Sequence, residues 1–232
     1  MLYYISFLFA STAVAWNYET HFIIVRMAYD LLMEKDPSIV DKIDSILADF
    51  SDETTLKNEH NWPMVECAVY GDQVKRSGGG YQSAWHFDDQ GFLADDVTED
   101  EVNFSSSPKN ITSAMPILHA WLSGEDVTGQ FAYESIMKRV DSEEEGISLA
   151  LRLLIHYYGD IHQPLHSVGR YSQENPKGDA GGNGFDLKYH LGANNLHSLW
   201  DSVIYTYRKS IQRPFSQSTW DFVGNIAWEL LS

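Results

Sequence analysis

Cysteine is almost missing from this chain of 232 residues, in which Cys67 is the single example. One thiol excludes a disulfide framework within the chain and any zinc finger built on several thiolates. Basic residues are also scarce: 16 Lys and Arg face 33 Asp and Glu, and the formal net charge is −17. Such a chain cannot hold a polyanion in a broad basic groove, because neutralising phosphates takes clustered Lys and Arg. A polyanionic ligand would have to be held by bound metal and by ring stacking.

Long apolar runs are absent after residue 15, so no transmembrane span is expected. Residues 1–15, MLYYISFLFASTAVA, form an apolar stretch of signal-peptide length that ends in the small-residue tripeptide 13–15. Signal peptidase favours such a tripeptide, and cleavage after it would expose Trp16. A buried N-terminal helix is the alternative interpretation. Two glycosylation acceptor motifs, at Asn103 and Asn110, agree with a secreted glycoprotein.

The rest of the composition favours a helical globular domain. Hydrophobic residues make up 44% of the chain and aromatic residues 13%, which is ample for a core. Residues 16–232 match the length of one domain. Because this segment ends inside a predicted helix, the protein is either compact or truncated at its C-terminal end. Apolar side chains recur at helical spacing, so we predict an all-α fold. The predicted helices cover residues 22–32, 39–50, 64–74, 117–122, 131–140, 143–161, 195–207 and 219–231, and the predicted long loops cover 88–107 and 169–184.

Histidine and aspartate recur at a spacing that is typical of metal sites. His156 and Asp160 are four residues apart, and so are His197 and Asp201. Residues four apart share one face of a helix, so each pair can hold one ion. Imidazole and carboxylate without thiolate suit zinc at a catalytic site, where positions stay open for water. A single histidine is more often structural than a ligand, but two such pairs, with His166 close by, make a structural role for the whole set a poor interpretation.

These motifs resemble those of the single-strand-specific zinc nucleases of the mung bean nuclease type. The resemblance rests on GDIHQPLH at residues 159–166, GGN at 181–183 and NLHSLWD at 195–201. That family includes 3′-nucleotidases and belongs with the zinc phospholipases C. The resemblance runs from Trp16 to about Asp201. It implies an all-α domain whose cleft holds three zinc ions, one of them bound by the amine and carbonyl of the mature N-terminal residue.

The resemblance also implies a set of ligands for each ion. The three sets are Asp72, His86, His156 and Asp160 for one ion; Trp16, His21 and Asp160 for its close neighbour; and His166, His197 and Asp201 for the third. Asp160 would therefore bridge two ions. Four histidines stay outside the sets, namely His60, His119, His162 and His190, and His162 is expected to support the site or the fold.

Three more residues take roles from the resemblance. Phe87 matches an aromatic residue that stacks the base on the 5′ side of the cut, although a core position fits the sequence equally well. Asp89 matches a carboxylate that positions the attacking water or the substrate. Three residues after Asp72 the family usually has an arginine, whereas this chain has Lys75. Lysine lacks the bidentate fork of arginine, so we expect phosphate binding to be weaker or to shift to Arg76.

The resemblance implies hydrolysis of single-stranded DNA and RNA to 5′-nucleotides, with 3′-nucleotidase activity, by a secreted monomer without stable membrane association. A zinc phospholipase C shares the metal centre, but its N-terminal tryptophan-to-histidine gap is wider and its last ligand is a glutamate. The gap of five from Trp16 to His21 and the last ligand Asp201 favour the nuclease. A catalytically inactive zinc-binding secreted protein is the second alternative, which Lys75 and the short C-terminal end leave open.

Overall fold

Helices dominate the computed structural model, which describes residues 17–104, 107–188, 192–203, 206–207 and 210–232. The predicted all-α class is confirmed. The α-helices are α1 Tyr18–Lys35, α2 Pro37–Leu47, α3 Glu53–Asn58, α4 Pro63–Glu66, α5 Tyr70–Val74, α6 Ile111–Leu122, α7 Phe131–Met137, α8 Glu143–Asp160, α9 Pro164–Ser167, α10 Leu196–Asp201 and α11 Gln217–Leu231. The 3₁₀ helices are η1 Cys67–Val69, η2 Gly79–His86 and η3 Glu99–Glu101, and the strands are β1 Gln90–Leu93 and β2 Val168–Tyr171.

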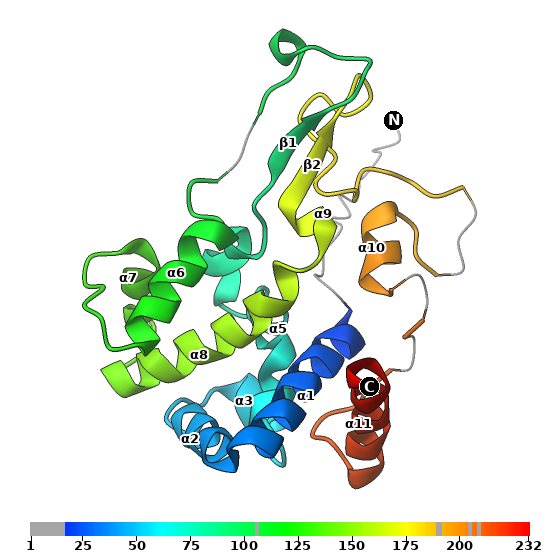
Figure 1. Cartoon of the computed structure of the whole chain (residues 1–232). Coiled ribbons are helices and arrows are strands. Elements are labelled where there is room, and N and C mark those ends of the chain that lie inside the picture. The colour runs from blue at the N-terminus through cyan, green and yellow to red at the C-terminus, as the bar shows by residue number, and fades with distance from the viewer. Residues whose placement is uncertain (1–16, 105–106, 189–191, 204–205, 208–209) are drawn as a thin grey trace, which may run out of the picture.

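Helix α8 runs through the middle of the helical body (Figure 1) and contacts α1, α2, α5, α6 and α7. Two local features stabilise the N-terminal end of α8. The Ser142 side chain caps it by accepting a hydrogen bond from the Glu145 backbone N–H, and acidic residues in its first turn interact favourably with the helix dipole. Two apolar cores lie against it. One contains Leu118 and Leu153, and the other contains Phe22. Polar side chains on α8 are therefore buried between the cores.

Strands β1 and β2 pair in parallel and form an arm above the helical body, which we call the β1–β2 arm (Figure 1). Both strands lie in segments predicted to be loops, so the prediction is wrong at residues 90–93 and 169–171. Each strand has only four residues and lacks a clear alternation of polar and apolar side chains. Pairing with a segment far along the chain creates them, and local sequence does not reveal such pairing.

The helix predicted over residues 64–74 is also wrong in detail, because it is divided into α4, η1 and α5. This break turns the backbone carbonyl of Ala68 toward α8, where it accepts a hydrogen bond from His156. Helix α3 and the 3₁₀ helix η2 were not predicted, and α10 ends at Asp201, before the predicted end at residue 207. Within the described parts of the chain, no helix is both long and apolar enough to cross a membrane.

Candidate metal centre

Three groups of His and Asp side chains meet near the C-terminal end of α8. Within each group, the atoms able to bind a metal lie within 4.8 Å of one another. The groups are His21, His156 and Asp160; Asp72, His86 and His156; and His166, His197 and Asp201. These are all eight side chains that the sequence analysis proposed as ligands, although His156 rather than Asp160 is shared between the first two groups. Trp16, the ninth proposed ligand, lies outside the described residues.

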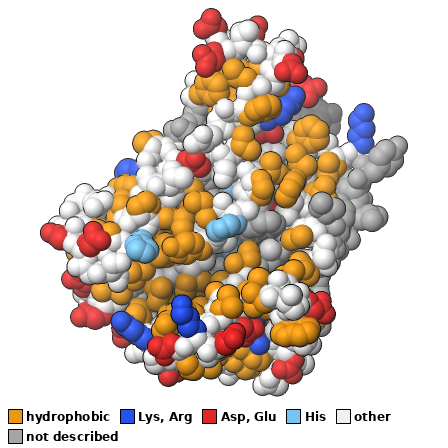
Figure 2. All heavy atoms as spheres, in the orientation of Figure 1, with side chains coloured by type: hydrophobic (Ala, Val, Ile, Leu, Met, Phe, Trp, Pro, Cys, Tyr) orange, Lys and Arg blue, Asp and Glu red, His pale blue; other side chains and the backbone are white. Residues whose placement is uncertain are grey.

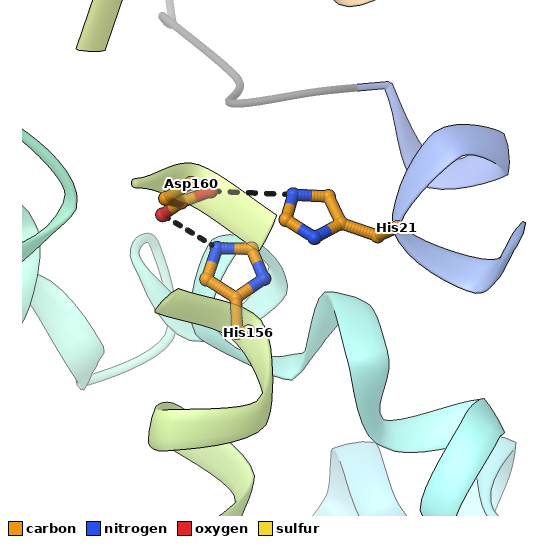
Figure 3. Close-up of side chains that lie close together, drawn as sticks. All are labelled: His21, His156 and Asp160. Carbon is orange, nitrogen blue, oxygen red and sulfur yellow. Dashed lines mark ion pairs between the residues drawn. The ribbon is translucent and has the colours of Figure 1, made fainter. Parts of the chain in front are cut away.

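The carboxylate of Asp160 faces several imidazoles, and Figure 3 shows its ion pairs with His156 of α8 and His21 of α1. Its Oδ1 lies 3.3 Å from Nε2 of His21. Its Oδ2 lies 3.2 Å from Nε2 of His156 and 2.7 Å from Nδ1 of His86. All four side chains are fully buried. Because its two oxygens face different ring nitrogens, this carboxylate can be shared by two metal ions.

Backbone carbonyls fix which ring nitrogen is left for a metal in three of the histidines. The Nδ1–H groups donate to carbonyl oxygens as follows: His156 to Ala68 at 2.8 Å, His166 to His86 at 2.7 Å and His197 to Gly181 at 2.7 Å. Because Nδ1 of each neutral ring carries the proton, Nε2 keeps its lone pair. Hydrogen bonds of this kind orient metal-binding histidines and set their tautomer.

His86 is oriented in the opposite sense, by a glutamine that the sequence analysis did not single out. Its Nε2–H donates to Oε1 of Gln82 at 2.6 Å. The Gln82 amide is fixed in turn, because its Nε2 donates to the carbonyl of Gly71 and its Oε1 also accepts from the Tyr157 hydroxyl. Nδ1 of His86 therefore bears a lone pair and lies 3.1 Å from Nε2 of His156. When His156 is neutral, two lone pairs this close repel each other, and a proton or a metal ion between the two nitrogens removes the repulsion.

The electrostatics of the cluster keep His86 and His166 neutral and favour a positive charge at His156. Burial, helped by Lys75, lowers the pKa of His86 to about 3. Burial also lowers the pKa of His166 to about 4. Burial disfavours a charged His156 as well, but the carboxylates of Asp160 and Asp72 outweigh it and raise the His156 pKa to about 10. These two carboxylates thus favour positive charge at His156, which either a proton or a metal ion can supply.

The third group carries a carboxyl whose pKa is also shifted. Burial is the main reason that the pKa of Asp201 rises to about 8, and the charges of Asp72 and Asp160 add to it. The amide of Gln163 opposes this shift by donating to Oδ1 of Asp201 at 2.7 Å. The other oxygen, Oδ2, lies 3.6 Å from Nε2 of His197. A cation held between them would favour the ionised carboxylate.

Bare polar atoms give a direct test of whether metal fits the cluster. Buried atoms without a hydrogen bond include Nε2 of His21, Oδ1 of Asp160, Oδ2 of Asp72 and Nε2 of His166. Burying such atoms without partners is costly. These four belong to proposed ligands, whereas two other bare atoms, Oε1 of Glu59 and Oε1 of Gln73, belong to residues outside the ligand sets. The thiol of Cys67 is not among the groups, since it is buried elsewhere and donates to the carbonyl of Met64. The donor set fits divalent metal ions bound by nitrogen and oxygen.

Two glycines allow the histidines to approach the ligand helices. A Cβ on Gly71 would lie 2.6 Å from Cδ2 of His156, and a Cβ on Gly159 would lie 2.5 Å from Nδ1 of His21. Each glycine directly precedes a proposed aspartate ligand, Asp72 or Asp160. Larger residues at these positions would push the imidazoles away from the carboxylates.

Phe87 and Asp89 lie beside the metal groups and line a cavity of about 280 Å³, which we call the Phe87 pocket. The ring of Phe87 has its centre 4.4 Å from that of His166. The backbone N–H of Asp88 donates to the carbonyl of His166 at 2.8 Å, which holds this segment against α9. Asp89 adopts a left-handed backbone with φ of 54°, a conformation that aspartate tolerates better than most residues. Burial raises its pKa, with a contribution from Asp88.

Lys75 connects the metal groups to the Phe87 pocket. Its Nζ donates to Oδ1 of Asp72 at 2.9 Å and lies 5.5 Å from the centre of the Phe87 ring. Arg76 is exposed. Three of the histidines left outside the ligand sets, His60, His119 and His162, are exposed and belong to none of the three groups. The fourth, His190, lies outside the described residues. His162 turns its Nδ1 to the carbonyl of Tyr158, 2.7 Å away.

Comparisons with known proteins agree on one family. A sequence model described as S1/P1 Nuclease matches residues 16–229. Endonuclease 1 of Arabidopsis thaliana is 26% identical over 200 residues, which are 84% of this chain and 55% of that protein. Nuclease S1 of Aspergillus oryzae is 40% identical over 70 residues, which are 30% of this chain and 21% of that protein. Endonuclease 3 of A. thaliana is 46% identical over 55 residues, 24% of this chain and 16% of that protein. The chain thus spans about half the length of Endonuclease 1 and less of the other two. Since the family model covers nearly all of it, the chain belongs to the S1/P1 nuclease family.

Proposed function

We propose that this protein is a secreted zinc-dependent phosphodiesterase that cleaves single-stranded DNA and RNA to 5′-nucleotides and removes phosphate from 3′-nucleotides. One observation carries the proposal: eight His and Asp side chains bring their metal-binding atoms together in three groups, and buried atoms of His21, Asp72, Asp160 and His166 have no hydrogen bond, in a chain of the S1/P1 nuclease family. The printed names of the matched relatives, Nuclease S1 and Endonucleases 1 and 3, agree with it.

We assign the ligands as three zinc sites. Asp72, His86, His156 and Asp160 would hold one ion; His21, Asp160 and the mature N-terminal Trp16 the second; and His166, His197 and Asp201 the third. Imidazole and carboxylate ligands support zinc over magnesium or calcium, which prefer oxygen ligands alone. Zinc at such a site lowers the pKa of bound water and polarises phosphoryl oxygens.

The proposed N-terminal ligand is supported by the residue that follows it. The backbone N–H of Asn17 donates to the carbonyl of Asp201 at 3.0 Å, and the Asn17 side chain caps α1, which carries His21. Residue 17 is thereby held next to the third ligand group. Cleavage after Ala15 would create an amine one residue away from this anchor. The proposal therefore includes removal of residues 1–15 and secretion of a monomer.

The Phe87 pocket supports single strands as the substrate. Its aromatic ring offers a stacking surface for a base, and a base is available for stacking only when it is not paired in a duplex. Asp89 can accept hydrogen bonds from a base or sugar in the same pocket. Figure 2 shows acidic side chains at the tip of the β1–β2 arm and along the edges, while the middle of the face is mainly apolar with histidine. Binding is therefore expected to depend on metal and stacking.

Lys75 is expected to assist the reaction from its place between Asp72 and Phe87. Its ammonium group can donate to a phosphoryl oxygen of a substrate whose base lies on Phe87, while the ion pair with Asp72 limits how far it moves. A lysine supplies a point charge with three donors and no bidentate fork. It would orient the phosphate and stabilise charge that builds up on its oxygens.

The test combines metal analysis with three substrate classes. The mature protein from Trp16 onward should contain about three zinc ions by the assignment above, and it should release acid-soluble nucleotides from denatured DNA and RNA and phosphate from 3′-AMP. Asp160→Asn should abolish these activities, whereas the control Asp41→Asn on the exposed face of α2 should not. Release of diacylglycerol from phosphatidylcholine without nucleotide release would identify a phospholipase. Bound zinc without turnover of any phosphoester would identify an inactive binding protein.

A further inference from the structure

The Phe87 pocket contains an ammonium group to which no role has yet been given. Lys177 lines this pocket together with Phe87, Asp89 and Tyr171. Its side chain is exposed, and among the described residues it makes no hydrogen bond or ion pair. It is thus not paired with Asp89 of the same pocket. In a chain with a net charge of −17, a lysine that no carboxylate neutralises is available to an anionic ligand.

The backbone on both sides of Lys177 is held in place. The carbonyl of Pro176 accepts a hydrogen bond from the backbone N–H of Asn103 at 3.0 Å. The backbone N–H of Gly178 donates to the carbonyl of Asn175, also at 3.0 Å. Lys177 therefore projects from an organised turn after β2, so less backbone freedom is lost when its ammonium group binds a ligand.

Which phosphate Lys177 can bind depends on how a nucleotide lies in the Phe87 pocket, and the orientation assumed here rests on the proposed function. The ring of Phe87 lies against His166, so a nucleotide stacked on Phe87 would have its 3′ phosphate at the metal groups. Among the described residues, Lys177 makes no hydrogen bond or ion pair with the side chains of those groups, and it lies in the turn after β2. The other phosphate that such a nucleotide carries in a strand is attached to its 5′ carbon.

We propose that Lys177 binds the 5′ phosphate of the nucleotide whose base occupies the Phe87 pocket. In this assignment, Phe87 and Asp89 bind the base. The metal centre and Lys75 bind the 3′ phosphate, and Lys177 binds the 5′ phosphate. Strands and nucleoside 3′,5′-bisphosphates are accordingly better substrates than nucleoside 3′-monophosphates.

Two small substrates that differ in this one phosphate test the proposal. Hydrolysis of the 3′ phosphate is measured for adenosine 3′-monophosphate and for adenosine 3′,5′-bisphosphate. The zinc-loaded wild type is compared with Lys177→Ala and Lys177→Arg. The control is Lys42→Ala, at an exposed position of α2. Lys177→Ala should raise KM for the bisphosphate roughly tenfold, the size of one charge-assisted contact, and change KM for the monophosphate less than about twofold. Lys177→Arg should keep most of the bisphosphate preference, and Lys42→Ala should keep all of it.

A second readout separates a phosphate contact from a merely structural role. In Lys177→Ala, the slope of log KM against log salt concentration for a single-stranded oligonucleotide should fall by about 0.7, the value for one contact to a single strand. Equal losses on the two small substrates, or no loss on either, would overturn the assignment to the 5′ phosphate. If the wild type hydrolyses neither substrate, the proposed function fails, and the inference fails with it; the wild-type rates alone reveal that case.

Discussion

Two fully buried carboxylates in this molecule have opposite surroundings. Glu66 in α4 accepts hydrogen bonds from four backbone N–H groups, those of His60, Asn61, Trp62 and Phe215. Asp160 in α8 faces the ring nitrogens of His21, His86 and His156 and leaves its Oδ1 without a hydrogen bond. Both carboxylates have 0% exposure, so burial alone does not distinguish them.

The groups that contact each buried carboxylate indicate its role. Backbone N–H groups are fixed donors, so the carboxylate of Glu66 is satisfied by the protein and ties the segment 60–62 to residue 215. His86 and His156 already donate from one nitrogen to other groups, so in their neutral forms they turn a lone pair to Asp160, and neither ring nitrogen of His21 has a hydrogen bond. A carboxylate among lone pairs is stable only with a proton or a cation between them. The first arrangement stabilises the fold, and the second binds ions.

The largest effect is expected from Asp160→Asn. The change removes the charge that faces three imidazoles and replaces one oxygen of the carboxylate that we assign to two ions. Activity on denatured DNA should fall by about a thousandfold or more, equal to about 4 kcal/mol of transition-state stabilisation. Zinc content, measured by atomic absorption, should fall by more than one ion per chain. Loss of a single ion with activity retained would show that Asp160 is not a bridge.

Glu66→Gln should have the complementary effect on stability. The amide would turn an NH₂ group toward backbone N–H donors, so at least one buried donor loses its acceptor. We expect the free energy of unfolding to fall by about 3 kcal/mol, measured by urea denaturation of the zinc-loaded protein. Zinc per folded chain should stay at the wild-type value. If Glu66→Gln lost zinc as Asp160→Asn does, the two carboxylates would not have separate roles.

A smaller effect is expected at Gln82, which fixes the tautomer of His86. Gln82→Leu removes the acceptor of the His86 Nε2–H, so the ring can bind metal through either nitrogen or rotate. Zinc affinity, measured by competition with a chromophoric chelator, should weaken roughly 10- to 100-fold. Gln217→Leu, at an exposed position of α11, is the matched control and should leave zinc affinity unchanged. An unchanged affinity in Gln82→Leu would mean that His86 is held without this bond.

Phe87→Ala should act on substrate binding and leave the metals in place. Loss of the stacking surface should weaken binding of single strands by about 1–3 kcal/mol. An oligonucleotide that lacks the base at the position of the cut should be affected less. The salt dependence of binding should be shallow in both proteins, because few phosphates are neutralised by side chains. A steep salt dependence, or indifference to the substitution, would mean that a basic surface does the binding.

Local sequence was sufficient for the parts of the molecule that depend on helical spacing. The pairs His156 with Asp160 and His197 with Asp201 lie on single helices, α8 and α10, so their spacing alone placed each pair on one face. The apolar period of α8 predicted the central helix almost to its ends. Asp72 and His86 were placed by family resemblance, because nothing in their spacing points to a metal.

Contacts between distant segments could not be predicted in this way. The pairing of Gln90 with Val168 creates both strands, and neither segment shows it alone. The acceptor for His156 is a backbone carbonyl, that of Ala68, whose direction depends on the break between α4 and α5. Gln82 gave no signal beyond lying four residues before His86. Such supporting groups follow from the packed fold, whereas the ligands were predicted from the spacing of His and Asp or from the family resemblance.

The most direct test of the central claim is anomalous diffraction at the zinc edge from crystals of the mature protein. We expect three zinc ions, two of them bridged by the carboxylate of Asp160, with nitrogen and oxygen ligands at roughly 2.0–2.2 Å. Glu66 should lie apart from every ion, bonded to the same backbone N–H groups. Zinc absent from the cluster, or Asp160 bound to one ion alone, would contradict the account.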